Sequence, residues 1–389
     1  MKEKLFSHIE ANKSTAFDMA WQIFDNPELG GEEVFACKLL TDRLKDLGFE
    51  TEVGVYGQPT GFRAQWKQGE DGPVIGIMGE YDALRQQGHA CGHHMQTPAA
   101  IAAFHALKDL LEKEGTPCTL VLYGTPAEES YGGKIIMAEN GAFRELDVVM
   151  VTHATGKYSY IASGSKAINS FLVDFHGKAA HASGSPHMGR SAADAMFLAF
   201  QGVEFMREHV KEDVRMHYTV REGLGPSNVV CPLAKASFTV RCNDNRDLPE
   251  LNARLRKVLE GACMMTETTC DIDPKRPYAA RIPNSVLTAV AAENFRLIGC
   301  NLAPEIMRRT NGSTDVGNIS VIVPTVNISV EYFDSPGHTE AWVEHGKSEY
   351  AEACLLKSAK MLAATAYDLI CNPELIEQAK EDFRKRMAE

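Results

Sequence analysis

The sequence predicts an α/β protein, in which a mainly parallel sheet with helices on both faces is interrupted by a smaller ferredoxin-like α+β domain. Buried-strand patterns alternate with amphipathic helices in the first part of the chain, a βαββαβ order replaces them in the middle, and the α/β pattern then returns. With 389 residues, 44% of them hydrophobic, the chain is long enough for two domains. We therefore expect a discontinuous catalytic domain of residues 1–166 and 280–389, and an inserted lid or dimerisation domain of residues 167–279.

The first part of the chain alternates helical and strand patterns. An amphipathic helix runs to about Phe24, and another follows the turn "NPELGGEE" over residues 34–47. Thr97 can cap a further helix that has Pro98 at its first position and Gly115 past its end. Strands are expected near residues 61–67, 74–79, 118–124 and 147–152.

The middle of the chain has the order of a ferredoxin-like domain. Strands are expected over residues 168–175, 215–221, 234–242 and 268–273, with helices over residues 190–210 and 248–264. The α/β pattern then resumes with a helix over residues 284–298, a strand near residues 323–330 and a long helix over residues 347–371.

Composition and charge exclude several classes of protein. The net charge of -12, without a basic stripe, makes nucleic acid an unexpected partner. No apolar run approaches the roughly 18 residues that a membrane span needs. The opening "MKEKLFSHIEANK" lacks the apolar core of a signal peptide, and the 10 cysteines show no paired spacing, so we expect reduced thiols in a cytoplasmic protein.

Polar residues collect at the ends of the predicted parallel strands, where α/β proteins bind ligands. One strand leads into "GEYDAL" and "GHACGHHM", the next ends in "GTPAEES", a third ends at His153, and the strand near residues 323–330 leads to "SPGHTEAW". Thiolate, imidazole and carboxylate ligands from separate strand ends are typical of a buried transition-metal site, which two ions could share.

Zinc or manganese in such a site would lower the pKa of a bridging water and polarise a substrate carbonyl. Neighbouring side chains diverge in an extended segment, so Glu129 can bind metal while Glu128 faces the water as general base and later as the acid for the leaving amine. Singly, Cys91 could be a buried apolar residue, and His153 or His338 an ordinary hydrogen-bonded side chain. Their joint placement after successive strands favours a site.

Six motifs occur in the order and at the spacing of a known family. They are "NPELGGEE", "GEYDAL", "GHACGHH", "GTPAEES", "FHGKAAHAS" and "GSTDVGN". Over almost its whole length the chain resembles the dinuclear-metal peptidase and amidohydrolase family that includes glutamate carboxypeptidase, aminoacylases and N-acyl-amino-acid hydrolases. It is most similar to the branch of auxin-conjugate, hippurate and aminobenzoyl-glutamate hydrolases.

The resemblance implies a role for particular residues. Glu128 would be the base, Asp82 would support the site, and His181 would reach into the partner's active site of a homodimer to stabilise an oxyanion. Asn228 and Arg241 are candidates for holding a substrate carboxylate. The implied ligands of two divalent ions are Cys91, His93, Glu129, His153 and His338.

Three positions depart from the family pattern. Glu80 stands where other branches have a histidine, His94 stands where most relatives have Asp or Asn, and "DALRQQ" replaces a glycine-rich turn. Within "GHACGHHM", Cys91 and His93 can point the same way on an extended chain, whereas His89 is expected to support the loop and His94 to point elsewhere.

The leading functional prediction is a metal-dependent amidase that releases a small acyl or aminoacyl group from an amino acid with a free carboxylate. A dipeptidase with the same site and a non-catalytic metal-binding homologue are the alternatives. The intact base Glu128 disfavours the non-catalytic homologue. A serine hydrolase built on Ser163 and Lys166 has no companion motif. The thiolate of Cys91 favours zinc, whereas the resemblance leaves manganese open.

Overall fold

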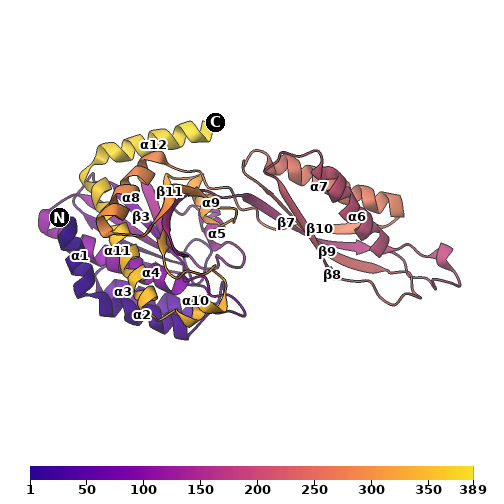
Figure 1. The fold of residues 1–389 in the computed structure, drawn as a ribbon, viewed down its shortest axis with the longest axis horizontal. Helices are drawn as coiled ribbons and strands as arrows, with labels where there is room; N and C mark the ends of the chain where they lie inside the picture. The colour runs from indigo at the N-terminus through magenta and orange to yellow at the C-terminus, as the bar shows by residue number, and fades with distance from the viewer. Residues whose placement is uncertain (389) are drawn as a thin grey trace. The chain divides into compact units, whose positions relative to one another are not determined.

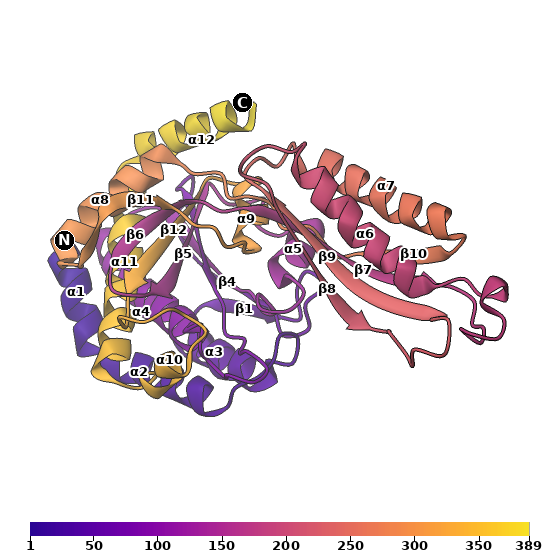
Figure 2. The same ribbon diagram turned by 45° about the vertical axis from the view of Figure 1, so that its right-hand side comes forward.

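The chain divides into two compact units, which are drawn in Figures 1 and 2. The computed structural model describes residues 1–388. The first unit contains residues 1–164 and 281–310 and the chain from Thr314 onward, and the second unit contains residues 165–280 and 311–313. The first unit is therefore discontinuous in sequence.

An eight-stranded sheet of order β1-β2-β4-β3-β5-β12-β6-β11 forms the centre of the first unit. The four adjacent strands β4, β3, β5 and β12 pair in parallel, as do β6 and β11, and the other pairs are antiparallel. The predicted mainly parallel α/β sheet is thus confirmed. The strands are β1 (Glu50–Val53), β2 (Phe62–Gln68), β3 (Val74–Gly79), β4 (Cys118–Gly124), β5 (Val148–Thr155), β6 (Ser159–Gly164), β11 (Leu302–Arg309) and β12 (Thr325–Glu331).

Strand β4 shows why the centre of the sheet is parallel and covered on both faces. All seven of its residues are buried. Leu120 and Leu122 belong to one core cluster, whereas the alternating Val121 and Tyr123 belong to another on the opposite face. A continuous apolar run such as "CTLVLYG" is stable only when helices cover both faces of the sheet.

Helices supply both covers. On the first face, buried side chains come from α1 (Lys2–Ala11), α2 (Lys13–Asp25), α3 (Val34–Asp46), α4 (His93–Glu114), α8 (Ser285–Ile298), α11 (Glu349–Cys371) and α12 (Pro373–Ala388). On the second face they come from α5 (Gly133–Glu139) and α9 (Val316–Ser320), while the short α10 (Glu340–Glu344) precedes α11. Among the described residues, we find no helix both long and apolar enough to cross a bilayer.

The start of α4 differs from the sequence prediction. The helix begins at His93 and not at Pro98, because Gly92 in a left-handed conformation (φ 80°) starts the turn and its carbonyl accepts a hydrogen bond from the Met95 N–H. Thr97 therefore does not cap the helix. Its hydroxyl donates instead to the carbonyl of Glu80 at 3.1 Å, which fastens α4 to the end of β3.

The second unit is a four-stranded antiparallel sheet of order β10-β7-β9-β8, the arrangement of a ferredoxin-like fold. Buried residues alternate with partly exposed ones along β7 and β9, and the buried set packs on α6 and α7. One apolar face per strand is what a sheet with helices on a single side requires. The elements are β7 (Ala167–His176), α6 (Ala192–Arg207), β8 (Arg215–Glu222), β9 (Leu233–Cys242), α7 (Leu248–Thr266) and β10 (Thr269–Pro274).

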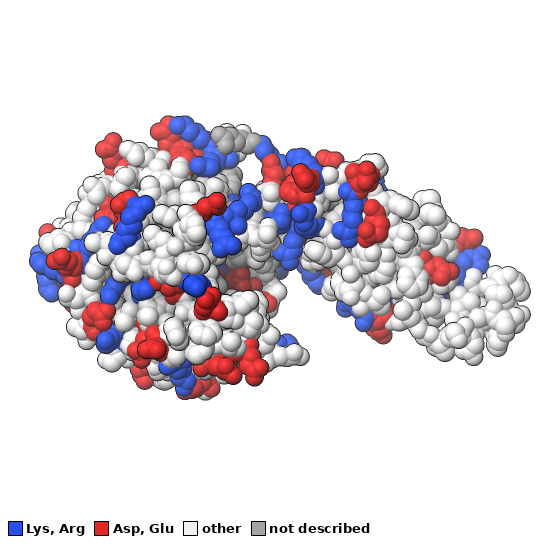
Figure 3. Space-filling view, in the orientation of Figure 1, with Lys and Arg blue, Asp and Glu red and all other residues white. Residues whose placement is uncertain are grey.

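Charged side chains of both signs are interspersed on each unit over the face shown in Figure 3. Acidic residues outnumber basic ones, 52 to 40, over the whole sequence.

Candidate metal centre

The carboxyl ends of four neighbouring parallel strands meet at one edge of the first unit's sheet. Asp82 follows β3, Glu128 and Glu129 follow β4, and His338 lies in the segment after β12. His153 lies inside β5, two residues before its end, and not after it as the sequence predicted. Because β4, β3, β5 and β12 are adjacent and parallel, these side chains share one edge.

Cys91 and His93 reach the same place by a left-handed turn. The sequence predicted an extended segment, but Gly92 has a φ of 80° and His93 is already the first residue of α4. A Cβ added at Gly92 would lie 3.0 Å from the Cβ of Ala154, so the backbone approaches β5 closely at this glycine.

The five predicted ligands converge. The Sγ of Cys91 lies 3.4 Å from the Nε2 of His153 and 3.3 Å from the Nε2 of His338. The Nε2 of His338 is also 3.3 Å from the Oε1 of Glu129. Potential ligand atoms of Cys91, His93 and His153 lie within 4.8 Å of one another, and so do those of His93, Glu128 and Glu129. We call the five predicted ligands, Cys91, His93, Glu129, His153 and His338, the donor cluster.

Hydrogen bonds fix which nitrogen two of the histidines offer. The Nδ1 of His93 is 2.9 Å from the Oδ1 of Asp82, and the Nδ1 of His153 is 2.6 Å from the carbonyl oxygen of Ala154. Each Nδ1–H therefore donates to an oxygen, which leaves the Nε2 lone pair for a metal. Asp82 also accepts a hydrogen bond from the backbone N–H of Glu129 at 2.8 Å, so one carboxylate orients two members of the donor cluster.

The donor cluster suits divalent cations. The Nε2 of His93 and the Oε1 of Glu129 are buried, and no well-aligned hydrogen bond to either atom is found among the residues described. Burial raises the pKa of the Cys91 thiol well above its ordinary value, and a bound cation would reverse this by stabilising the thiolate. Although burial opposes it, the contact with His338 lowers the pKa of Glu129 to about 2, so this carboxylate is charged and ready to bind. Thiolate, imidazole and carboxylate together fit Zn²⁺ or Mn²⁺.

The other two histidines of "GHACGHHM" have structural partners. The Nε2 of His89 donates to the carbonyl of Ile23 at 3.1 Å, and the Nε2 of His94 donates to the carbonyl of Gly346 at 2.9 Å. Both side chains are buried. His89 thus supports the loop, as the sequence predicted, and His94 points away from the donor cluster.

The base candidate Glu128 follows a strained residue. Ala127 has a φ of 63°, a left-handed conformation that disfavours residues other than glycine. Its backbone N–H donates to the carboxylate of the fully buried Glu33 at 2.8 Å. Glu33 also accepts hydrogen bonds from the N–H of Gly31 at 2.8 Å and the hydroxyl of Thr60 at 2.7 Å. The segment "NPELGGEE" therefore holds the backbone of residues 126–129, which we call the "PAEE" loop.

Three further buried charges lie beside Glu128. They are Glu80, Lys134 and Asp315, and the Lys134 ammonium is 2.6 Å from Glu80 and 2.8 Å from Asp315. Burial, with repulsion from Glu80 and Asp315, raises the pKa of Glu128 well above its ordinary value, and Lys134 acts in the opposite direction. The sequence contained no functional signal for Glu33, Lys134 or Asp315, although the motif "NPELGGEE" contains Glu33 and the motif "GSTDVGN" contains Asp315.

His181, Asn228 and Arg241 lie in the second unit. The Nδ1 of the exposed His181 accepts hydrogen bonds from the N–H groups of Ser183 at 3.3 Å and Gly184 at 3.1 Å. A neutral His181 ring therefore carries its proton on Nε2 and presents a donor to its surroundings. The exposed Asn228 is bound to the same segment, since its main-chain carbonyl accepts a hydrogen bond from the N–H of Ala182 at 2.9 Å.

Arg241 lies on β9. Its guanidinium is partly buried and donates to the hydroxyl of Ser313 at 3.1 Å. Burial lowers its pKa from the ordinary value, yet an arginine remains charged at neutral pH.

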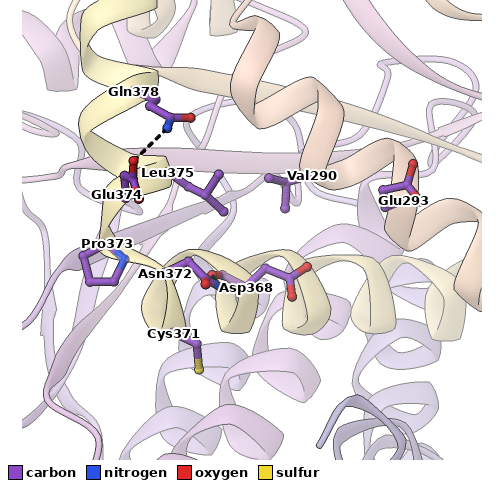
Figure 4. A pocket seen from close by; sticks show the side chains of 9 residues that line it. All are labelled: Val290, Glu293, Asp368, Cys371, Asn372, Pro373, Glu374, Leu375 and Gln378. Atoms are coloured by element: carbon purple, nitrogen blue, oxygen red, sulfur yellow. Dashed lines mark hydrogen bonds between the residues drawn. The ribbon is translucent and has the colours of Figure 1, made fainter.

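A pocket of about 590 Å³ lies elsewhere in the first unit, among α8, α11 and the start of α12 (Figure 4). Its lining includes Val290, Cys371, Leu375 and Gln378, and Figure 4 shows the Gln378 amide donating to Glu374. None of its lining residues belongs to the donor cluster. We therefore place the chemistry at the sheet edge and not in this pocket.

The mainly parallel sheet gathers thiol, imidazole and carboxylate side chains at its carboxyl edge, with a further acid beside them. This fold and this site together define a metal-dependent hydrolase. The comparisons with known proteins agree: the chain belongs to peptidase family M20/M25/M40, whose sequence profile matches residues 71–368. Members hydrolyse amide bonds, and the chain is a hydrolase of this kind.

Two curated relatives and one solved structure illustrate the similarity. Xaa-Arg dipeptidase of Mus musculus is 33% identical, with 86% of this chain and 80% of the relative covered. A p-aminobenzoyl-glutamate hydrolase component of Escherichia coli (strain K12) is 29% identical, with 97% of this chain and 93% of the relative covered. A dinuclear metal binding peptidase from the M20 family of Bacillus subtilis has a TM-score of 0.67 at 19% identity, with 89% of this chain and 98% of that chain covered.

Proposed function

We propose that the chain hydrolyses the amide bond of N-acyl amino acids or aminobenzoyl-glutamate-like compounds, with two divalent ions, Zn²⁺ or Mn²⁺, and with Glu128 as general base. The observation that supports this most is the convergence of five metal-type donors beside a second, adjacent glutamate. The relative from E. coli, by its name part of a p-aminobenzoyl-glutamate hydrolase, supports the substrate class.

The donor cluster would hold the two ions. When bound, they lower the pKa of a water and polarise the scissile carbonyl. Glu128 accepts the proton of the attacking water and then delivers it to the leaving amine nitrogen. Asp82 keeps His93 in the tautomer whose Nε2 is available, through the 2.9 Å contact with its Nδ1.

The second unit is proposed to serve as lid and dimerisation domain. In a homodimer, the Nε2–H of His181 from one chain would donate to the oxyanion that develops on the substrate of the second chain. Arg241 and Asn228 would hold the free carboxylate of the amino-acid part, because a guanidinium and an amide both donate hydrogen bonds to carboxylate oxygens.

A dipeptidase is the second candidate. It uses the same donors and base, and it is favoured by the relative at 33% identity that is named a dipeptidase. A panel of N-acetyl, N-benzoyl, aminobenzoyl-glutamate and dipeptide substrates, compared by kcat/KM, distinguishes the two candidates. A clear preference for dipeptides would replace the first candidate by the second.

We further propose that the protein works in the cytoplasm. All 10 cysteines are free thiols in the structure, which suits a reducing compartment.

The variant Glu128→Gln tests the mechanism. It keeps the shape of the side chain but cannot take a proton, so we expect about 1000-fold loss of kcat with metal content unchanged. Glu129→Gln is the matched comparison, because losing the proposed ligand should release metal as well as activity. Wild-type turnover by the purified Glu128→Gln protein would refute the proposed base.

A further inference from the structure

Lys134 is fully buried and pairs with the two acids that lie beside the proposed base Glu128. Its side chain is 0% exposed, and its ammonium lies 2.6 Å from an oxygen of Glu80 and 2.8 Å from an oxygen of Asp315. The backbone N–H of Lys134 donates to the other oxygen of Asp315 at 3.1 Å. Lys134 and Asp315 are thus joined at two points.

The ammonium neutralises a crowded group of acids. Carboxylate oxygens of Glu80, Glu128 and Asp315 lie within 4.8 Å of one another. Three carboxylates this close repel one another strongly when they are shielded from water. Although burial alone would lower it, attraction from Asp315 and Glu80 raises the pKa of Lys134, which therefore stays charged.

The path of the chain explains how Lys134 comes to lie near Glu128, which is six positions earlier in the sequence. The carbonyl of Ala127 accepts hydrogen bonds from the N–H groups of Gly132 at 3.0 Å and Gly133 at 3.3 Å. A Cβ added at Gly133 would lie 1.9 Å from the carbonyl oxygen of Pro126, so only glycine allows the loop to close. The "PAEE" loop returns to its own start, and Lys134 follows at once.

Glu80 connects this lysine to the donor cluster. One of its oxygens faces Lys134, and the other accepts a hydrogen bond from the amide of Gln96 at 2.8 Å and lies 3.1 Å from the Nε2 of His93. Glu80 is therefore held from two sides, and it links Lys134 to the proposed metal ligand His93. Glu80 and Asp315, the two acids paired with Lys134, are also the acids that lie beside Glu128.

A purely structural need does not explain this arrangement. Burying an ammonium with several carboxylates carries a large desolvation cost, and apolar side chains of similar volume often stabilise a protein as well or better. The charged set is instead placed where the reaction would take place.

We propose that Lys134 is a positioning residue, whose ammonium fixes Glu80 and Asp315 and thereby holds the carboxylate of Glu128 in place beside the donor cluster. This inference rests on the proposed function of Glu128. Lys134 itself touches neither substrate nor metal in this role.

The variant Lys134→Met tests the proposal, because methionine fills a similar volume without the charge. In the metal-loaded full chain we expect kcat to fall about 100-fold while KM changes less than about 3-fold and the number of bound ions stays the same. Lys360→Met is the matched control. Lys360 also pairs with a carboxylate, Glu10, at 2.6 Å, but lies on α11 outside the site, so kcat should not change.

A second variant separates positioning from folding. The double variant Lys134→Met with Asp315→Asn removes one charge of each sign and should fold, yet we expect its kcat to stay at the low level of Lys134→Met. Wild-type kcat in either variant would overturn the proposal. So would failure of both to fold, because the buried charges would then serve the stability of the unit. If the wild type lacked hydrolase activity, the proposed function itself would fail, which is a distinguishable result.

Discussion

Replacing Glu33 by glutamine tests how the base is held. The carboxylate of Glu33 accepts hydrogen bonds from Gly31 and Thr60 on one oxygen and from Ala127 on the other. A glutamine offers one oxygen and one NH₂ group, so at least one buried backbone N–H would face another donor. An unpaired buried N–H costs about 1 to 3 kcal/mol, and the remaining bonds lose about 1 kcal/mol of charge assistance.

Part of this loss is recovered. Burial raises the pKa of Glu33, which means that the charged form is already penalised, and a neutral glutamine escapes that penalty. We therefore expect Glu33→Gln to lower the free energy of unfolding by about 2 kcal/mol. Because Ala127 then loses the partner that keeps its φ at 63°, Glu128 shifts and kcat should fall at least about 10-fold.

The assay is urea unfolding followed by circular dichroism, together with kcat of the metal-loaded protein. Glu32→Gln is the control, since Glu32 is exposed and next in sequence, and its free energy of unfolding should change by less than about 0.5 kcal/mol. If Glu33→Gln were as stable and as active as the wild type, the carboxylate would not hold the "PAEE" loop.

Two further predictions concern the proposed homodimer and the effect of acid. When Glu128→Gln and His181→Ala chains are mixed and allowed to exchange, half the dimers should be mixed, and each mixed dimer has one site with both Glu128 and an intact His181 from the other chain. About a quarter of wild-type activity should therefore return. No recovery would mean that His181 does not act across a dimer. Burial, with repulsion from His93, lowers the pKa of His89 to about 3, so the stability that its neutral form contributes is present above about pH 6.5 and is lost as pH falls toward 3. In wild type the His89 side chain should add about 1.4 kcal/mol per pH unit to the loss of unfolding free energy in this window, and His89→Gln should lack this contribution. Urea unfolding of both proteins at pH 4.5 and 5.5 measures the difference. Equal pH dependence of the two proteins would contradict the assignment.

The buried elements were the ones the sequence predicted best. The strand prediction for residues 118–124 matches β4, and that for residues 74–79 matches β3, because both are continuous apolar runs next to turns. The sequence did not predict the mostly exposed edge strand β11, since "LAPEIMRR" has no such run. The helix expected up to about Phe24 is two helices, α1 and α2, that meet at Asn12.

The sequence predicted the residues of the donor cluster, but not the buried residues that hold the site in place. Strand ends with His, Cys and Glu stand out along the chain, and the structure brings all five predicted ligands together. Lys134 and Asp315 are 181 residues apart, and Glu33 and Ala127 are 94 apart. Such contacts depend on tertiary packing, so a single buried lysine or glutamate gave no local signal. The left-handed turn at Gly92 was likewise hidden, because glycine is compatible with many conformations.

Metal content measured together with turnover tests the central claim most directly. The protein should lose activity when a chelator strips it and regain activity as Zn²⁺ or Mn²⁺ is added back. We expect full activity at about two ions per chain in the wild type, and fewer ions with little activity in Cys91→Ser, which lacks the thiolate of the donor cluster. Full hydrolysis of N-acyl amino acids and dipeptides by metal-free protein would contradict the metal-dependent mechanism.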